Sequence, residues 1–123
     1  MPRLGGARIL LVEDDTDSRE MFCWALEECG AAIACAGTAG EALALWPQVK
    51  PQVLVSDISL PDDAFSLVRM AKANGIPALA VTGRGMPHEK AEILLRGFDV
   101  HLLRPIDPNM LCEAVAALLA EAQ

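Results

Sequence analysis

The sequence predicts an α/β domain in which a five-stranded parallel sheet has helices on both faces. Segments typical of strands alternate with segments typical of helices five times along the 123 residues. The first, third and fourth strand segments are nearly continuous apolar runs, as expected for strands that are covered on both sides. The connections are short, so the repeated strand–helix unit indicates one sheet and a single domain over residues 1–123.

Most of the expected strands are followed by turn-forming or polar residues, and most of the expected helices begin at a residue suited to a helix start. The strands are expected at Arg8–Glu13, Ala32–Ala36, Val53–Asp57, Pro77–Thr82 and Val100–Leu103. The helices are expected at Asp17–Cys29, Thr38–Trp46, Ala64–Ala73, from Pro87 to just before Gly97, and from Asp107 onward.

Local signals set these helix boundaries. Thr16 or Asp17 is expected to cap the first helix. Thr38 and Glu41 have the spacing of a capping box, which predicts the start of the second helix. Pro47 lacks a backbone N–H, so the second helix is expected to end just before it. The glycines that follow the first, third and fourth helices are Gly30, Gly75 and Gly97.

Composition excludes several classes of function. The net charge of −7 argues against a nucleic-acid surface, which is ordinarily basic, and favours protein partners. No apolar run reaches the roughly 18 residues needed to cross a membrane, and no membrane partner is expected. Residues 1–6 are expected to be a short flexible lead without the pattern of a secretory signal, and the location is predicted to be cytoplasmic. The cysteines lack metal-ligand spacing and are expected to be reduced, mostly buried thiols: Cys23, Cys29, Cys35 and Cys112.

Chemically capable residues stand where four of the strands end. The carboxyl ends of parallel strands share one edge of a sheet, and a flavodoxin-like strand order of 2-1-3-4-5 puts the first and third strands side by side. Glu13 and Asp14 should therefore lie beside Asp57. Thr82 ends the fourth strand and Arg104 follows the fifth.

A divalent cation would resolve the repulsion within this acidic group. Two carboxylates about 4 Å apart repel by roughly 4 kcal/mol at an effective dielectric constant near 20. Mg²⁺ with oxygen ligands suits such a site. The alternative is that Glu13 and Asp14 belong to a polar turn before the first helix, and that Asp57 begins another turn. The joint site is favoured because the acids end two different strands.

Three further residues are candidates for holding an anion beside the metal. Thr82 offers a hydroxyl and Gly83 an exposed backbone N–H; the alternative is an ordinary turn. Arg104 could balance the charge of a phosphoryl group, and its alternative is a solvated surface charge. The bond between Arg104 and Pro105 is also a candidate cis peptide.

Four motifs, in order, resemble those of bacterial response-regulator receiver domains. They are Ile9-Leu10-Leu11-Val12-Glu13-Asp14-Asp15, Val55-Ser56-Asp57-Ile58-Ser59-Leu60-Pro61, Ala80-Val81-Thr82-Gly83, and the pair Gly97-Phe98-Asp99 with Leu102-Leu103-Arg104-Pro105-Ile106. The resemblance extends from Arg8 to about Leu119 and supports the (βα)5 flavodoxin-like fold.

The resemblance implies a phosphoacceptor signalling domain rather than an enzyme with a turnover substrate. Asp57 would accept a phosphoryl group from a histidine kinase or a histidine phosphotransfer protein. Mg²⁺ would be held by Glu13, Asp14, Asp57 and the backbone carbonyl of Ser59, while Asp15 would flank the site.

The resemblance also implies a switch that follows phosphorylation. Thr82 and Gly83 would bind the phosphoryl oxygens, Arg104 would stand where the family carries Lys, and His101 would take the place of a switch aromatic. The surface of the fourth helix, fifth strand and fifth helix would then bind a downstream target protein, or form a homodimer.

Three departures from the family pattern bear on this function. Arg104 carries a planar, forked guanidinium where the family has Lys, whose ammonium is a compact point charge. The loop after Pro61 is one residue shorter than usual and reads Asp62-Asp63-Ala64-Phe65. His101 is smaller and more polar than the usual Tyr or Phe, which could make the switch weaker or pH-sensitive.

These departures motivate an alternative, a degenerate receiver that acts as a phosphorylation-independent interaction module. A third hypothesis is a Mg²⁺-dependent phosphohydrolase with an aspartyl intermediate. Such enzymes commonly place a second acid two residues after the nucleophile, where this chain has Ser59. A flavin-binding flavodoxin is disfavoured because the acidic loop after the first strand would repel a phosphate.

Overall fold

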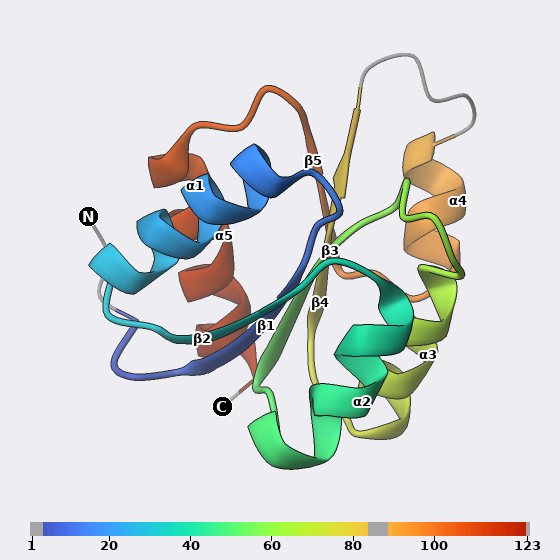
Figure 1. Ribbon diagram of the computed structural model, residues 1–123, viewed down its shortest axis with the longest axis horizontal. Helices are drawn as coiled ribbons and strands as arrows, with labels where there is room; N and C mark the ends of the chain where they lie inside the picture. Colours follow the sequence, from blue (N-terminus) through green and yellow to red (C-terminus); the bar gives the residue numbers. More distant parts are fainter. Residues whose placement is uncertain (1–3, 84–88, 123) are drawn as a thin grey trace.

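Five parallel strands form one sheet in the order β2-β1-β3-β4-β5 in the computed structural model, which describes residues 4–83 and 89–122 (Figure 1). The strands are β1 Arg8–Val12, β2 Ala32–Ala36, β3 Val53–Asp57, β4 Ala78–Thr82 and β5 Val100–Leu103. The strand order and the strand positions confirm the flavodoxin-like fold predicted from the sequence. The strands β3 and β4 are buried at every position, which explains why they are apolar up to the polar residues at their carboxyl ends.

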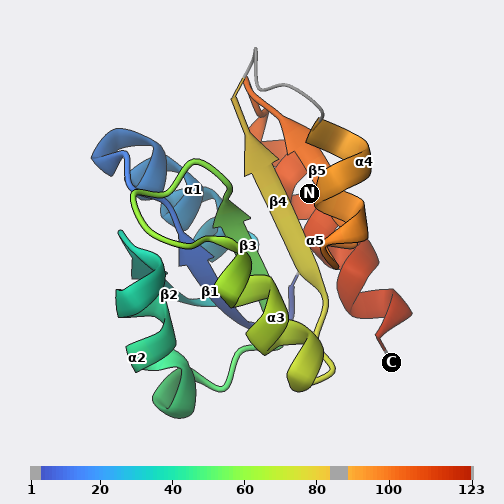
Figure 2. The same cartoon turned by 90° about the vertical axis from the view of Figure 1, so that its right-hand side faces the viewer.

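Helices cover both faces of this sheet. They are α1 Thr16–Glu28, α2 Ala39–Val49, α3 Phe65–Ala73, α4 Glu89–Leu95 and α5 Pro108–Glu121. The views in Figures 1 and 2 place α1 and α5 on one face, and α2, α3 and α4 on the other. Two apolar cores result: one is built around Phe22, Leu26 and Leu111, and the other around Trp46, Leu67 and Phe98. Among the described residues, no helix is long and apolar enough to cross a membrane.

The strand register brings the carboxyl ends of the inner strands to one edge. Val12 pairs with Ser56, Asp57 pairs with Val81, and Thr82 pairs with Leu103. The residues that follow or end these strands, including Glu13 and Arg104, therefore meet at this edge. Backbone geometry thus gathers side chains that are far apart in the sequence.

The first helix has a different cap from the one predicted. Asp15, rather than Thr16 or Asp17, is the N-cap, with φ −78° and ψ 119°, and its carboxylate accepts the Ser18 N–H at 2.9 Å. Thr16 and Asp17 already belong to the helix, whose first free N–H groups need an acceptor one residue earlier. The predicted cap of α5 is confirmed, because Asp107 accepts the N–H of Asn109 at 2.7 Å.

The second helix does not end at Pro47 as predicted. It continues to Val49, and the N–H of Lys50 still donates to the Trp46 carbonyl at 2.9 Å. A proline removes one donor, while the donors of the residues after it remain available to extend the last turn. The helix ends instead at Lys50, whose φ of 48° is left-handed. Thr38 is confirmed as the N-cap, because its hydroxyl accepts the Glu41 N–H at 3.1 Å. The return bond differs from that of a full capping box, because the Glu41 carboxylate accepts the N–H of Gly37 at 3.1 Å. The expected start of the fourth helix at Pro87 lies outside the described residues.

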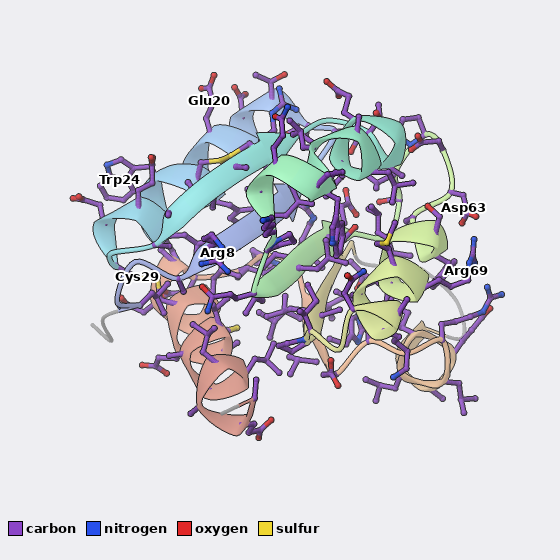
Figure 3. The ribbon with its side chains drawn as sticks, turned by 90° about the horizontal axis from the view of Figure 1, so that it is seen from below. Arg8, Glu20, Trp24, Cys29, Asp63 and Arg69 are labelled. Carbon is purple, nitrogen blue, oxygen red and sulfur yellow. A yellow bond between two sulfur atoms is a disulfide. The ribbon has the colours of Figure 1, made fainter. Side chains whose placement is uncertain are left out.

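The cysteines differ from the expectation of reduced thiols, which is wrong for this structure. Disulfides join Cys23 to Cys35 and Cys29 to Cys112 (Figure 3). The first links α1 to β2 and the second links the end of α1 to α5. Sequence spacing did not reveal these pairs because each depends on how α1 packs against another element.

The residues just before β1 are also held in place. Leu4 is buried, and its N–H donates to the Cys29 carbonyl at 2.6 Å, while the Gly6 N–H donates to Gly30 at 2.7 Å. Residues 4–6 therefore pack against the end of α1, which differs from the flexible lead expected there. Residues 1–3 lie outside the described part of the chain.

Candidate functional site

Three acidic side chains meet at the carboxyl edge of the sheet. Glu13 and Asp14 follow β1 and Asp57 ends β3, and one carboxylate oxygen from each lies within 4.8 Å of those of the other two. Glu13 is 1% exposed and Asp57 is 4% exposed, whereas Asp14 is exposed. The acidic cluster predicted from the sequence is therefore present, and two of its members are almost entirely removed from water.

Arg104 supplies the positive charge that this buried cluster needs. One guanidinium nitrogen, Nη2, forms an ion pair with Glu13 Oε1 and lies 3.5 Å from Asp57 Oδ2. The other oxygen of Glu13 accepts the backbone N–H of Asp15 at 3.2 Å. A buried carboxylate without a partner would be costly, so this pairing explains how Glu13 is accommodated.

The first helix positions the guanidinium of Arg104. Its Nη1 donates to the Ser18 hydroxyl at 3.2 Å, and its central carbon lies 5.6 Å from the centre of the Phe22 ring. Burial lowers the pKa of Arg104, but an arginine remains cationic at neutral pH. The Arg104–Pro105 peptide bond is cis, as considered from the sequence. Ser18 and Phe22 were not predicted, because nothing in their local sequence points to Arg104.

Ser59 holds the carboxylate of Asp57. Its backbone N–H and its hydroxyl each donate to Asp57 Oδ1 at 2.9 Å. Sequence reasoning assigned only the carbonyl of Ser59 a role, so these two donors are an additional feature of the site. Together with Arg104 on the other oxygen, they fix the orientation of the Asp57 carboxylate.

The fourth and fifth strands contribute a second, less acidic group. Thr82 is fully buried, and its hydroxyl is hydrogen-bonded to Nε2 of the half-buried His101. The carbonyl of Thr82 accepts the backbone N–H of Arg104 at 2.8 Å, which ties the ends of β4 and β5 together. Gly83 follows directly at the same edge. The structure thus brings Thr82, Gly83, His101 and Arg104 to the side of the acidic cluster that faces β5.

Two residues around Glu13 stabilise the acidic loop. Arg19 donates from Nη1 to the Glu13 carbonyl at 2.8 Å, a contact that sequence reasoning did not predict. Asp15 is exposed and caps α1, and the hydrogen bonds from Ser18 lower the pKa of its carboxyl. Asp15 therefore flanks the cluster, as the sequence predicted, while its side chain serves the helix.

The donor set suits a hard divalent cation. Carboxylate and carbonyl oxygens are the ligands that Mg²⁺ prefers, and it usually retains several waters rather than requiring a closed protein cage. An exposed Asp14 beside two buried acids leaves one side of the cluster open to solvent. The residues present therefore fit a partly hydrated Mg²⁺.

The chain is similar to known proteins over nearly its whole length. The model of the response regulator receiver domain matches residues 9–116. An uncharacterized 14.6 kDa protein of Leptolyngbya boryana is 35% identical, with 94% of this chain and 92% of that protein covered. Protein PilH of Pseudomonas aeruginosa is 30% identical, with 93% and 98% covered. The transcriptional regulatory protein PmrA of Pectobacterium parmentieri is 34% identical, but the chain spans only 54% of its length.

Solved structures show the same fold. The CheY-like response regulator receiver domain protein of Methanospirillum hungatei superimposes with a TM-score of 0.85 at 31% identity, covering 94% of this chain and 95% of that one. The chemotaxis response regulator CheY4 of Vibrio cholerae gives a TM-score of 0.80 at 27% identity, with 91% and 98% covered. The chain belongs to the response-regulator receiver domains, the signalling domains of two-component systems.

Proposed function

We propose that this receiver accepts a phosphoryl group on Asp57, with Mg²⁺ held by Glu13, Asp14, Asp57 and the backbone carbonyl of Ser59. The observation that carries the proposal is the convergence of three carboxylates within 4.8 Å at the end of β1 and β3, with Arg104 beside them. Such a group is costly to build for structure alone, because well-packed apolar residues in place of a buried ion pair often cost no stability.

The donor is a phosphohistidine on a sensor histidine kinase or a histidine phosphotransfer protein. Transfer breaks the P–N bond of the phosphohistidine and forms a P–O bond to a carboxylate oxygen of Asp57. The imidazole nitrogen keeps the bonding electrons and takes up a proton. Bound Mg²⁺ would neutralise negative charge on the phosphoryl oxygens. Ser59 aims the Asp57 carboxylate by two hydrogen bonds.

The β4–β5 side of the site then receives the phosphoryl group. Arg104 lies 3.5 Å from Asp57 and can pair with a phosphoryl oxygen, while Thr82 and Gly83 supply a hydroxyl and a backbone N–H. Thr82 must leave its hydrogen bond with His101 to do so. His101 thus couples the phosphoryl site to β5.

Surfaces next to this site are suited to protein partners. A groove of about 380 Å³ beside Arg104 is lined by Ser18, Met21, Phe22, Arg104, Pro105 and Ile106. A donor that approaches Asp57 would contact this groove. Leu95 in α4 is 87% exposed and Leu103 in β5 is 53% exposed, which supports the α4–β5–α5 surface as the place where a downstream target or a second copy binds. The proposal places this signalling in the cytoplasm, which localisation of a tagged chain in the source cells would test.

The experiment is phosphorylation by a small phosphodonor. With acetyl phosphate and Mg²⁺, intact-mass spectrometry of the unmodified chain is expected to show one added phosphoryl group, about 80 Da, and Asp57→Asn is expected to show none. Asp99→Asn is the matched control, because Asp99 caps the start of β4 through the Ala78 N–H, at the opposite edge of the sheet.

A degenerate receiver is the alternative that Arg104 favours, because its ion pair with Glu13 already balances charge at the site. Absence of an adduct on the unmodified chain, with Mg²⁺ and phosphodonor in excess, would contradict the phosphoacceptor proposal and support the alternative. Repeated turnover of a phosphate ester would instead support a phosphohydrolase.

A further inference from the structure

The carboxylate of Asp62 joins two segments that meet at the carboxyl edge of the sheet. Asp62 Oδ1 accepts the N–H of Ala39 at 2.8 Å, and Oδ2 accepts the N–H of Gly40 at 2.9 Å. Both donors lie at the start of α2, more than 20 residues away in the sequence. One side chain therefore connects the loop after β3 to the helix after β2.

The start of α2 is suited to receive this carboxylate. The first N–H groups of a helix lack partners within the helix, and the helix dipole favours a negative charge there. The Thr38 hydroxyl accepts the N–H of Glu41, and Asp62 satisfies two further donors. The hydrogen bonds from Ala39 and Gly40 lower the pKa of the Asp62 carboxyl, because they stabilise its ionised form.

The two hydrogen bonds of Asp62 restrain the loop that carries Ser59. At one end of this loop, Ser59 donates two hydrogen bonds to Asp57, and three residues later Asp62 is fixed on α2. The segment before α2 is connected in turn to the acidic cluster, because the carbonyl of Ala36 accepts the Glu13 N–H at 3.0 Å. Asp62 is thus connected to Glu13 through its hydrogen bonds to the start of α2, the short backbone segment 36–39 and the hydrogen bond from Glu13 to Ala36.

We propose that Asp62 is a positioning residue for the cation site: it fixes the loop after β3 so that the Ser59 carbonyl faces the carboxylates of Glu13, Asp14 and Asp57. This inference rests on the proposed function. It gives a role to the shortened loop after Pro61. With one residue fewer, this loop has less conformational freedom between Asp57 and its attachment to α2.

The next residue provides a matched control. Asp63 has the same charge, and hydrogen bonds likewise lower the pKa of its carboxyl. Its partners, however, are local to α3: Arg69 at 2.9 Å and the Phe65 N–H at 3.0 Å. Figure 3 shows the Asp63 and Arg69 side chains close to each other on the outside of the molecule. Neutralising Asp63 therefore removes a charge from the same loop without releasing it from α2.

The test compares Asp62→Asn with Asp63→Asn. An asparagine can accept one of the two N–H groups but presents its own NH₂ to the other. Calorimetric titration with Mg²⁺ is expected to show about tenfold weaker binding for Asp62→Asn, as for other groups that orient metal ligands. Asp63→Asn is expected to bind Mg²⁺ like the unmodified chain, and Asp62→Glu, which keeps the carboxylate, to recover part of the affinity.

A second readout needs no metal. Amide hydrogen exchange in Mg²⁺-free protein is expected to be faster at residues 58–60 in Asp62→Asn and unchanged there in Asp63→Asn. Unchanged exchange and unchanged Mg²⁺ affinity in Asp62→Asn would overturn the positioning role alone, as would equal weakening in both variants. If the unmodified chain binds no Mg²⁺, both this inference and the proposed function fail.

Discussion

The two halves of the site are built differently. On the β1–β3 side, Glu13, Asp14 and Asp57 form the acidic group that the sequence resemblance implies. On the β4–β5 side, Arg104 stands where the sequence resemblance implies Lys, and His101 stands where it implies an aromatic residue. In the proposed transfer, the acidic half carries the reacting carboxylate and the cation ligands. The other half supplies a positive charge and a hydroxyl, which more than one set of side chains can do.

Removal of the charge that joins the two halves is expected to have the largest effect. Arg104→Ala leaves the buried Glu13 without its cation and should lower the free energy of unfolding by about 3 kcal/mol. In Arg104→Ala/Glu13→Gln the loss should be smaller than the sum of the single losses by about 2 kcal/mol, because each residue matters mainly through the other. Urea unfolding without Mg²⁺ measures the free energy of unfolding of the unmodified chain, of Arg104→Ala, of Glu13→Gln and of the double variant. Additive losses would show that the two halves are not coupled.

A smaller effect is expected when the family residue is restored. Arg104→Lys keeps the charge but cannot reach the Glu13 carboxylate and the Ser18 hydroxyl together, because a single ammonium replaces a fork. Ser18→Ala should therefore cost about 1 kcal/mol more in the Arg104 chain than in Arg104→Lys. Thermal and urea unfolding of the four combinations provide the comparison. An equal cost of Ser18→Ala in both backgrounds would mean that α1 is not adapted to arginine.

The smallest effect concerns the outer edge of the acidic half. The folded pKa of Asp15 is depressed by the Ser18 N–H, so its ionised form stabilises the folded state above the ordinary pKa, and this contribution is lost as the pH falls through the lower, folded value. Asp15→Ala should therefore be less stable than the unmodified chain at pH 7, and the difference should shrink below about pH 4. Asp17→Ala, the neighbouring acid in the first turn, serves as the control. A difference that persists undiminished in acid would exclude the ionised cap as its cause.

The sequence was sufficient to predict the sheet and the acidic half of the site. Apolar runs predict the strands, and the rule that parallel strands share one carboxyl edge predicts that Glu13 and Asp57 lie together. These signals lie within single strands, where the pattern of apolar residues can be read directly from the sequence. The cap at Asp15 was missed because several neighbouring residues could have served.

Contacts between elements were the part that could not be predicted. The Ser18 and Phe22 contacts with Arg104, the tie from Asp62 to α2 and the pairing of Cys29 with Cys112 all depend on how two segments pack. Residue types alone do not report such distances. The continuation of α2 past Pro47 likewise depends on whether the backbone N–H groups after the proline find acceptors within the helix. The position of the proline alone does not predict this.

The central claim is that acids from two separate strands form one cation site around Asp57, and Mn²⁺ in place of Mg²⁺ tests it most directly. In the NMR spectrum of the unmodified chain, substoichiometric Mn²⁺ is predicted to broaden the amides of residues 13–15 and 57–59 together, and excess Mg²⁺ to restore them. The amides of Ala32 and Ala78, at the opposite ends of their strands, should stay sharp. Broadening of only one of the two segments, or of neither, would contradict the claim.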